Sequence, residues 1–204
     1  MRTVVTEMNV ERCEWALEPA ILQRYHDTEW GVPLHHDQKQ FEFLILEGMQ
    51  AGLSWLCVLN KRENFRRAFD QFGPEKIARY GRRKIASLLK DAGIIRNRLK
   101  IEATVTNARA FLAVLEQSGS FQRFMWQFVD GKPVVNRWRN MKELPVKSQE
   151  SDAMSKELIH RGFRFVGSTI CYAHMQATGM VNDHLAGCFR HAEVSRMGKS
   201  DGRR

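Results

Sequence analysis

Four residues near the two ends of the chain have the types and spacing of a metal site. Cys13 and His26 lie near the start of the 204-residue sequence, and His184 and Cys188 lie near its end. The second pair is spaced i, i+4, which places both side chains on one face of a helix or turn. Two thiolates and two imidazoles form a ligand set that favours zinc. The spacing also fits two buried cysteines and two unrelated histidines, so these residues alone leave both interpretations open.

Glu47 is a second candidate for chemistry, because it lies within the apolar segment LILEGMQAGLSW. On a helix it falls at the border of the stripe that Leu44 belongs to, where a carboxylate costs free energy unless it is paired or faces a ligand. It is therefore either a helix-edge residue paired with a surface base or a pocket carboxylate for a ligand with N–H groups or positive charge. Four aromatic residues near it are candidates for the pocket wall, although each alone is more often a core residue: Trp15, Tyr25, Trp30 and Trp55.

The segment DAGIIRNRLK at residues 91–100 places Gly93 between two predicted helices. Backbone N–H groups freed at such a turn and at the next helix N-terminus can hold a phosphate, and Arg96, Arg98 and Lys100 surround it. One hypothesis is a helix–hairpin–helix clamp that grips the nucleic-acid backbone without choosing a sequence. The other is an ordinary helical hairpin with a solvated basic face.

The net charge of +9, from 32 basic and 23 acidic residues, is concentrated in one region. Residues 61–100 hold thirteen basic and four acidic side chains, an excess equal to that of the whole chain, and residues 190–204 hold five against two. The remainder is slightly acidic. Such an uneven distribution favours a binding face for a polyanion, most often nucleic acid, over charge kept for solubility.

Other features exclude several classes of protein. No window approaches the roughly 18 apolar residues of a membrane span, and MRTVVTEMNVERCEW contains no apolar core of a signal peptide. We therefore expect a cytoplasmic protein without a membrane partner. Four cysteines in a chain of this length do not form a disulfide scaffold, and Cys57 and Cys171 lie in apolar runs typical of core thiols.

The elements that must position these residues are mostly helices. Asp37 is placed to cap the first of them, with Gln40 as its capping-box partner, and Ser54 to cap the second. Apolar residues at helical spacing predict helices over 37–50, 54–69, 82–92, from about 97 through 115, 151–160 and 168–179. Only 133–135 and 163–166 are weak strand candidates. The sequence predicts a compact all-α fold of two lobes meeting at a cleft, with a frayed N-terminus (1–10), a single domain (11–188, its hairpin lobe about 38–150) and a basic, disordered tail (189–204).

Taken together, several segments resemble the DNA-3-methyladenine glycosylase I family of bacterial base-excision repair enzymes. The resemblance runs in family order across residues 11–188. It is carried by ERCEWA (11–16), YHDTEWGVP (25–33), FEFLILEGMQAGLSW (41–55), LNKRENFRRAF (59–69), DAGIIRNRLKI (91–101), RGFRFVGSTICY (161–172) and MVNDHLAGC (180–188).

The resemblance implies a helix–hairpin–helix glycosylase fold with one structural zinc that joins the N- and C-terminal segments. The ligands carry over to Cys13, His26, His184 and Cys188. The pocket glutamate carries over to Glu47, and the pocket aromatic residues to Tyr25 and Trp55, with Trp15 and Trp30 nearby. The segment that fills the gap in the duplex carries over to Gly52 and Leu53, with Gln50 beside it. The phosphate-holding hairpin carries over to Gly93, Arg96, Arg98 and Lys100.

The implied activity is hydrolytic removal of 3-methyladenine from double-stranded alkylated DNA by a monomer, leaving an abasic site and without lyase activity. Adenine methylated at N3 is cationic within DNA and leaves as a neutral base, so little acid catalysis and no assigned general base are needed. The nucleotide flips, stacks on Trp55 and Tyr25, and presents its amino edge to Glu47 while Leu53 fills the stack. Four protein ligands leave zinc no open position for water.

The sequence departs from the family pattern at Leu22, where members commonly have a tyrosine three positions before YHD, and at LEPAIL, where they have DPLY. Leu22 makes one wall of the pocket more apolar, which raises the alternative of a glycosylase for another alkylated base. A second alternative is a non-catalytic, zinc-stabilised DNA-binding module. The sequence leaves open whether 3-methylguanine is removed and what the basic tail does.

Overall fold

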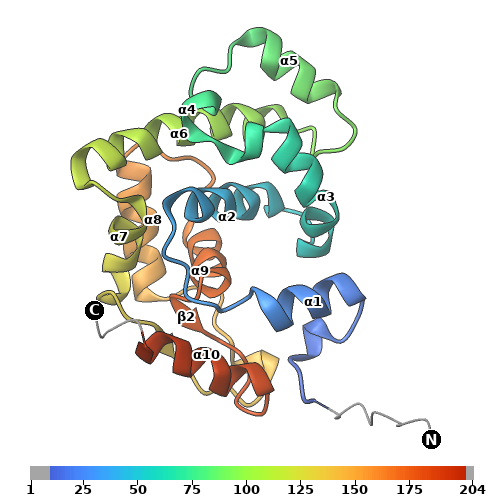
Figure 1. Ribbon diagram of the computed structural model, residues 1–204, viewed down its shortest axis with the longest axis vertical. Helices are drawn as coiled ribbons and strands as arrows, with labels where there is room; N and C mark the ends of the chain where they lie inside the picture. Colours follow the sequence, from blue (N-terminus) through green and yellow to red (C-terminus); the bar gives the residue numbers. More distant parts are fainter. Residues whose placement is uncertain (1–9, 201–204) are drawn as a thin grey trace, which may run out of the picture.

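The computed structural model describes residues 10–200, with side chains to residue 198, so almost all of the predicted frayed N-terminus lies outside the described residues. Within this range the chain is mainly helical, which confirms the all-α prediction (Figure 1). Its elements are α1 (Ala20–Thr28), α2 (Asp37–Gln50), α3 (Trp55–Ala68), α4 (Pro74–Ile77), α5 (Arg82–Lys90), α6 (Arg98–Ser118), α7 (Phe121–Trp126), β1 (Val134–Val135), α8 (Gln149–His160), α9 (Ser168–Ala177), β2 (Val181–Asn182) and α10 (Phe189–Ser200).

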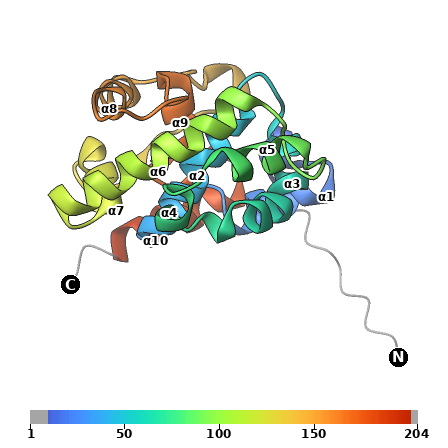
Figure 2. The same cartoon turned by 90° about the horizontal axis from the view of Figure 1, so that it is seen from above.

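Helix α2 lies at the centre of the fold, and every residue from Gln40 to Met49 is buried. Helices α3, α6, α7 and α9 contact it, and α6 crosses the molecule beside it (Figure 2). Phe41 packs on Phe111 of α6 with ring centroids 5.0 Å apart, and Phe111 packs on Phe121 of α7 at 4.6 Å. Each buried phenylalanine stabilises the fold by about 1.5–3 kcal/mol. This packing fixes α2, the helix that carries Glu47.

The start of α2 differs from the prediction. His36, rather than Asp37, caps the helix, because its ring accepts a hydrogen bond from the backbone of Lys39. The Asp37 carboxylate instead accepts bonds from Ser120 Oγ and from the backbone N–H of Gln122, and so caps α7. The predicted capping box is also wrong, since the Gln40 side chain is buried and donates to the carbonyl of Leu34. Both Asp37 and Gln40 therefore make hydrogen bonds to other segments of the chain instead of to the start of α2.

The turn between α2 and α3 agrees with the prediction. Ser54 caps α3 by accepting a bond from the backbone N–H of Cys57 at 3.2 Å. Gly52 has φ of +78°, in the left-handed region that glycine adopts without steric cost. The turn therefore exposes Leu53 between two fixed helices.

Strand structure is minimal in the described residues. Strands β1 and β2 are two residues each and pair in parallel, with Val134 opposite Val181. The candidate at 133–135 thus contributes to a strand, whereas the candidate at 163–166 is wrong. That segment connects α8 to α9, and its burial does not alternate, because Phe163 and Val166 are buried while the two residues between them are exposed.

The prediction of a disordered tail (189–204) is wrong for residues 189–200, which form α10, and residues 201–204 lie outside the described residues. Val194 is only 1% exposed and anchors the helix. Asn182 of β2 donates hydrogen bonds to the carbonyl of His191 and to Ser195 Oγ. Together with α1, α10 lies at one end of the molecule (Figure 1), so the segment that contains Cys13 and His26 lies near the one that contains His184 and Cys188.

A second, smaller hydrophobic cluster lies at this end of the molecule. It contains Cys13, Tyr25, Trp30, Phe43, Leu59, Ala177, Leu185 and Cys188. No helix in the described part of the chain has the length and apolar character to cross a membrane.

Candidate functional site

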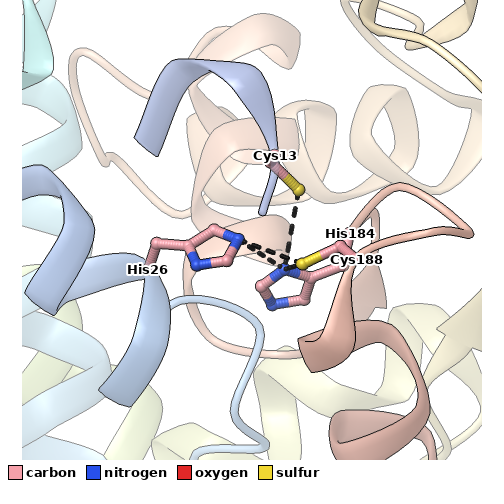
Figure 3. Close-up of side chains that lie close together, drawn as sticks. All are labelled: Cys13, His26, His184 and Cys188. Carbon is pink, nitrogen blue, oxygen red and sulfur yellow. Dashed lines mark hydrogen bonds between the residues drawn. The ribbon is translucent and has the colours of Figure 1, made fainter. Parts of the chain in front are cut away.

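The structure brings the four predicted metal ligands together in the interior. Cys13, His26, His184 and Cys188 are all buried, and one ligand atom from each lies within 4.8 Å of the others. Figure 3 shows the four side chains converging, two from the N-terminal and two from the C-terminal segment. His26 Nε2 lies 3.2 Å from His184 Nδ1, and Cys188 Sγ lies 3.4 and 3.7 Å from these two atoms. Cys13 Sγ lies 3.8 Å from His184 Nδ1.

These separations fit a four-coordinate metal. Zinc held tetrahedrally at about 2.3 Å from sulfur and 2.0–2.1 Å from nitrogen keeps neighbouring ligand atoms about 3.3–3.8 Å apart. Four of the six separations between ligand atoms run from 3.2 to 3.8 Å, and all are within 4.8 Å. The residues present therefore suit a zinc ion in both chemistry and spacing.

The outward nitrogens of both histidines are also partnered. His26 Nδ1 lies 2.8 Å from Asp27 Oδ1, and the carboxylate is held by the Arg12 guanidinium at 2.9 Å. His184 Nε2 lies 3.0 Å from the carbonyl oxygen of Trp30. These acceptors place a proton on each outward nitrogen and leave the inward nitrogen free to bind a metal. The sequence interpretation missed Asp27, although an acid directly after a predicted ligand is a usable signal.

The thiols are arranged as ligands too. A hydrogen bond between the two thiols lowers the pKa of Cys188 and raises that of Cys13, as expected for two sulfur atoms that share one proton. The backbone N–H of Leu185 donates to Cys13 Sγ at 3.4 Å. Gly31, with φ of +81°, permits the close approach, since a Cβ there would lie 2.9 Å from His184 Nε2.

A buried carboxylate anchors the segment that carries His184. Asp183 is 1% exposed and accepts four hydrogen bonds of 2.6–2.8 Å from side chains of other segments. The donors are Asn136, Trp138, Tyr172 and Gln176. Such a network holds the backbone at the ligand in one position. The sequence interpretation missed this role because its partners are distant in the chain.

Glu47 lies in a different environment. It is 3% exposed, burial raises its pKa to about 8, and its Oε2 atom has no hydrogen-bond partner among the described residues. The Tyr25 hydroxyl and the Trp55 indole N–H are buried without partners as well. Burial, followed by the charge of Glu47, raises the pKa of Tyr25 well above its usual value. An acceptor and two potential donors thus remain unsatisfied together, which is rare in native interiors.

The four predicted pocket aromatics divide between the two sites. Tyr25 and Trp55 are neighbours, with ring centroids 5.5 Å apart. Trp30 instead packs edge-on against His184 of the metal cluster at 4.6 Å. Trp15 contacts both groups, since it lies 6.4 Å from Tyr25 and 5.1 Å from Trp30. Tyr25 and Trp55 thus form the aromatic wall beside Glu47, and Trp30 supports the ligands.

Lys100 has a different environment from the one its sequence position indicates. Its side chain is 7% exposed, and Nζ donates to the carbonyl oxygens of Met49 and Ala51 at 2.7 and 2.6 Å. The cation therefore satisfies the C-terminal end of α2 and complements its dipole. It joins the start of α6 to the turn that carries Gly52 and Leu53.

The hairpin between α5 and α6 exposes its arginines. Arg96 and Arg98 are exposed, and Arg98 makes only a long 3.4 Å contact with Glu102. The Gly93 N–H, expected to be free for phosphate, donates to Asp91 Oδ1 at 2.8 Å, while Asn97 caps α6 through Lys100 N. Exposed arginines rather than the glycine amide are left for an anion at this turn.

Part of the basic excess of residues 61–100 is neutralised inside the protein. Arg62 is 7% exposed and pairs with Glu42 and Glu29 at 3.0 and 2.6 Å. Arg66 also pairs with Glu42, at 2.6 Å, and with Glu63. Charge counting along the sequence could not detect these pairs, because Glu29 and Glu42 lie outside the basic region.

Comparison with known proteins agrees with this arrangement. The family model described as methyladenine glycosylase matches residues 15–191. The chain is 49% identical over 179 residues to DNA-3-methyladenine glycosylase 1 of Escherichia coli (strain K12), covering 88% of this chain and 96% of that protein. It is 49% identical over 177 residues to DNA-3-methyladenine glycosylase of Haemophilus influenzae, covering 87% and 96%.

Solved structures share the fold. A crystal structure of 3-methyladenine DNA glycosylase I superposes with a TM-score of 0.85 at 50% identity, covering 88% of this chain and 98% of that one. A Staphylococcus aureus 3-methyladenine DNA glycosylase I, solved to explain 3-methyladenine recognition, gives 0.85 at 33% identity, covering 87% and 95%. The resemblance is confirmed, and the chain belongs to the methyladenine glycosylase family.

Proposed function

We propose that this protein hydrolyses the glycosidic bond of 3-methyladenine in alkylated double-stranded DNA. Its relatives are named as DNA-3-methyladenine glycosylases, which supports the proposal. The observation that carries the proposal is the group of unsatisfied buried polar atoms on Glu47, Tyr25 and Trp55. Unpartnered atoms cost folding free energy, about 1–3 kcal/mol each. A ligand that offers N–H groups, an acceptor and an aromatic face would satisfy them together.

A methylated purine cation has these properties. Its positive charge compensates the Glu47 carboxylate, its amino group donates to that carboxylate, and its ring stacks on Tyr25 and Trp55. In the reaction the C1′–N9 bond breaks with its electron pair passing to the base, which leaves neutral. Water adds to C1′ and loses a proton, which produces an abasic site. Glu47 acts by holding the electron-poor base, so neither a general base nor a lyase nucleophile is assigned.

Flipping requires that the protein hold a distorted duplex. Gln50 ends α2, and Gly52 and Leu53 lie in the turn that follows, where the exposed Leu53 can fill the space that the base vacates. Arg96 and Arg98 are exposed on the hairpin after Gly93 and suit phosphates. Tyr25 and Glu47 are each 3% exposed, so the aromatic wall must shift to admit a base. One chain holds all these parts, and we propose that it acts as a monomer.

The buried Cys13, His26, His184 and Cys188 would hold one zinc ion with a structural role. When bound, zinc supplies four strong bonds between the two ends of the chain. Those four protein ligands complete a tetrahedral shell and leave no position for an activated water. The ion would therefore position α1, and with it Tyr25, and would not take part in the hydrolysis.

Base release from alkylated DNA tests the proposal. Purified protein should release 3-methyladenine, and Glu47→Gln should slow single-turnover release at least about a hundredfold, since it removes the charge that favours the cationic base. Trp55→Ala should have a similar effect through lost stacking. Leu17→Ala, at a side chain 57% exposed, is a matched control. A wild-type protein that binds abasic duplex but releases no base would favour the non-catalytic module, and full activity in both variants would refute the pocket assignment.

Leu22 bears on which alkylated bases are accepted. It packs against the cluster that contains Tyr25, so the pocket has an apolar wall at that side. A panel of DNAs carrying 3-methyladenine, 3-methylguanine and 7-methylguanine should show 3-methyladenine released fastest. Faster release of another base would support the alternative of a glycosylase for a different lesion.

A further inference from the structure

Phe165, in the connector between α8 and α9, is exposed although its backbone is strained. Its φ is +56°, in the left-handed region where a bulky residue is a steric outlier, and its side chain is 36% exposed. Glycine would adopt this conformation without cost. Strain of this kind persists where the surrounding structure imposes it, often at functional sites.

The connector is held rigidly on both sides of Phe165. Asn107 of α6 donates to the carbonyl of Arg164 at 3.0 Å and accepts from the backbone N–H of the same residue at 2.8 Å. The carbonyl of Val166 accepts a bond from Ser155 Oγ at 2.7 Å. These bonds fix the backbone on both sides of Phe165, so that little backbone freedom is lost when the residue contacts a partner.

The position of Phe165 is next to both parts of the proposed DNA-binding site. Its Cβ and carbonyl oxygen lie 3.4 Å from where a Cβ on Gly48 would be, and Gly48 directly follows Glu47. Phe165 also lines a small cavity of about 10 Å³ together with Lys100. Lys100 in turn binds the carbonyl of Ala51, in the turn that carries Leu53.

An apolar hollow of about 640 Å³ extends from Phe165 along α6. Its wall includes Leu99 and Ile159, which are 67% and 57% exposed, and α8 and α9 lie along this side of α6 (Figure 2). Leu99 directly follows the exposed Arg98 of the hairpin. The apolar hollow therefore begins one residue after the basic hairpin, and an apolar floor near arginines is complementary to the sugars and bases of a DNA strand whose phosphates the arginines bind.

We infer that Phe165 is a further DNA-contacting residue, which packs against the nucleotide next to the flipped base while Leu53 fills the gap. Aromatic side chains in this role stack on a base or wedge beside it, whatever the sequence. The inference rests on the proposed function, because it requires that the chain bind a duplex with a nucleotide turned out. It adds an aromatic contact beside the one that Leu53 makes.

The test compares Phe165→Gly with the wild-type protein. Glycine relieves the strain at φ of +56° and so offsets the packing and chain entropy that the change costs, and the variant should unfold cooperatively in urea close to the wild type. Its affinity for a duplex with a tetrahydrofuran abasic-site analogue should fall about tenfold, in the range for one lost aromatic contact. The salt dependence of binding should not change, because no charge is removed. Phe165→Tyr should keep the affinity, and Val146→Ala, at a side chain 73% exposed, should match the wild type.

Unchanged affinity in a folded Phe165→Gly variant would overturn the inference. Concentration-dependent self-association of the wild type that Phe165→Gly abolishes, with DNA affinity intact, would also overturn it and assign the hollow to a second copy of the chain. Failure of the proposed function has a different signature, since the wild type would then release no methylated base.

Discussion

The metal cluster and the Glu47 pocket are equally buried, yet their polar groups differ in hydrogen bonding. Both histidines of the cluster have an acceptor for the outward ring nitrogen, and the two inward nitrogens face the Cys188 thiol. In the pocket, Glu47, Tyr25 and Trp55 each keep a buried polar atom without a partner. A satisfied network stabilises one structure, whereas an unsatisfied one stores free energy that a ligand can release. This difference indicates that the metal cluster stabilises the fold and that the Glu47 pocket binds a substrate.

The two sites are joined at α1. Tyr25 and His26 are consecutive residues, and one side chain contacts Trp55 while the other faces the cluster. Trp15 packs on both of them, at 6.4 and 5.3 Å. The cluster therefore positions one wall of the pocket. A substitution that disrupts the metal cluster should also displace Tyr25 in the Glu47 pocket.

The largest effect is expected from breaking the cluster. Cys188→Ala should remove bound zinc and lower the free energy of unfolding by at least about 4 kcal/mol, since metal loss is one of the few changes of that size. Metal content by mass spectrometry and urea unfolding measure the two effects. Cys171→Ala is the matched control, because that thiol is equally buried but lies outside the cluster. A metal-free protein as stable as the wild type would contradict the assignment.

The pocket should respond to pH in two opposite ways. Burial raises the pKa of Glu47 to about 8, above the usual value of about 4.5 expected in the unfolded chain. The folded state thus binds the extra proton between these values, so stability falls as pH rises from 4.5 through 8, by up to about 1.4 kcal/mol per pH unit. The neighbouring Tyr25 stays neutral throughout, because its pKa is raised well above its usual value.

Activity should change with the opposite sign. Only the ionised carboxylate favours a cationic base, so kcat/KM for 3-methyladenine should rise with pH and level off above about 8. Glu47→Gln should remove both the rise in activity and the fall in stability. Urea unfolding and single-turnover release from pH 5 to 9 measure them. If wild-type activity did not change between pH 5 and 9, Glu47 would not be a buried carboxyl group that must lose its proton for the reaction.

Local signals in the sequence predicted much of this architecture, and tertiary contacts decided the rest. Ser54 caps its helix as predicted, and the helix expected from about residue 97 begins after its cap, Asn97, because a cap needs only nearby backbone. Asp37 caps a different helix, α7, because residues 120–122 fold against it. The resemblance located the ligands and the pocket glutamate, but no local pattern shows that Glu47 lacks a partner. That property depends on every element around it.

The same reasoning explains why Lys100 was predicted to face DNA. Its spacing after Arg96 and Arg98 indicates a shared basic surface, whereas the fold turns its side chain inward to the end of α2. The basic residues of the hairpin therefore differ in the same way as the metal cluster and the Glu47 pocket, because some have hydrogen-bond partners within the protein and others are left for a ligand. Lys100 has two close acceptors, while the Arg98 side chain is 65% exposed.

The smallest predicted effect separates these two cations. Arg98→Met should weaken binding to any duplex a few-fold and lower the slope of log affinity against log salt by about one, because one phosphate contact is lost. Lys100→Met should leave that slope unchanged but lower the free energy of unfolding by about 1–3 kcal/mol, since two carbonyls lose their donor. Binding titrations at several salt concentrations and urea unfolding measure the pair. The opposite pattern would mean that Lys100 leaves α2 to meet DNA, and that the hairpin arginines are only a solvated face.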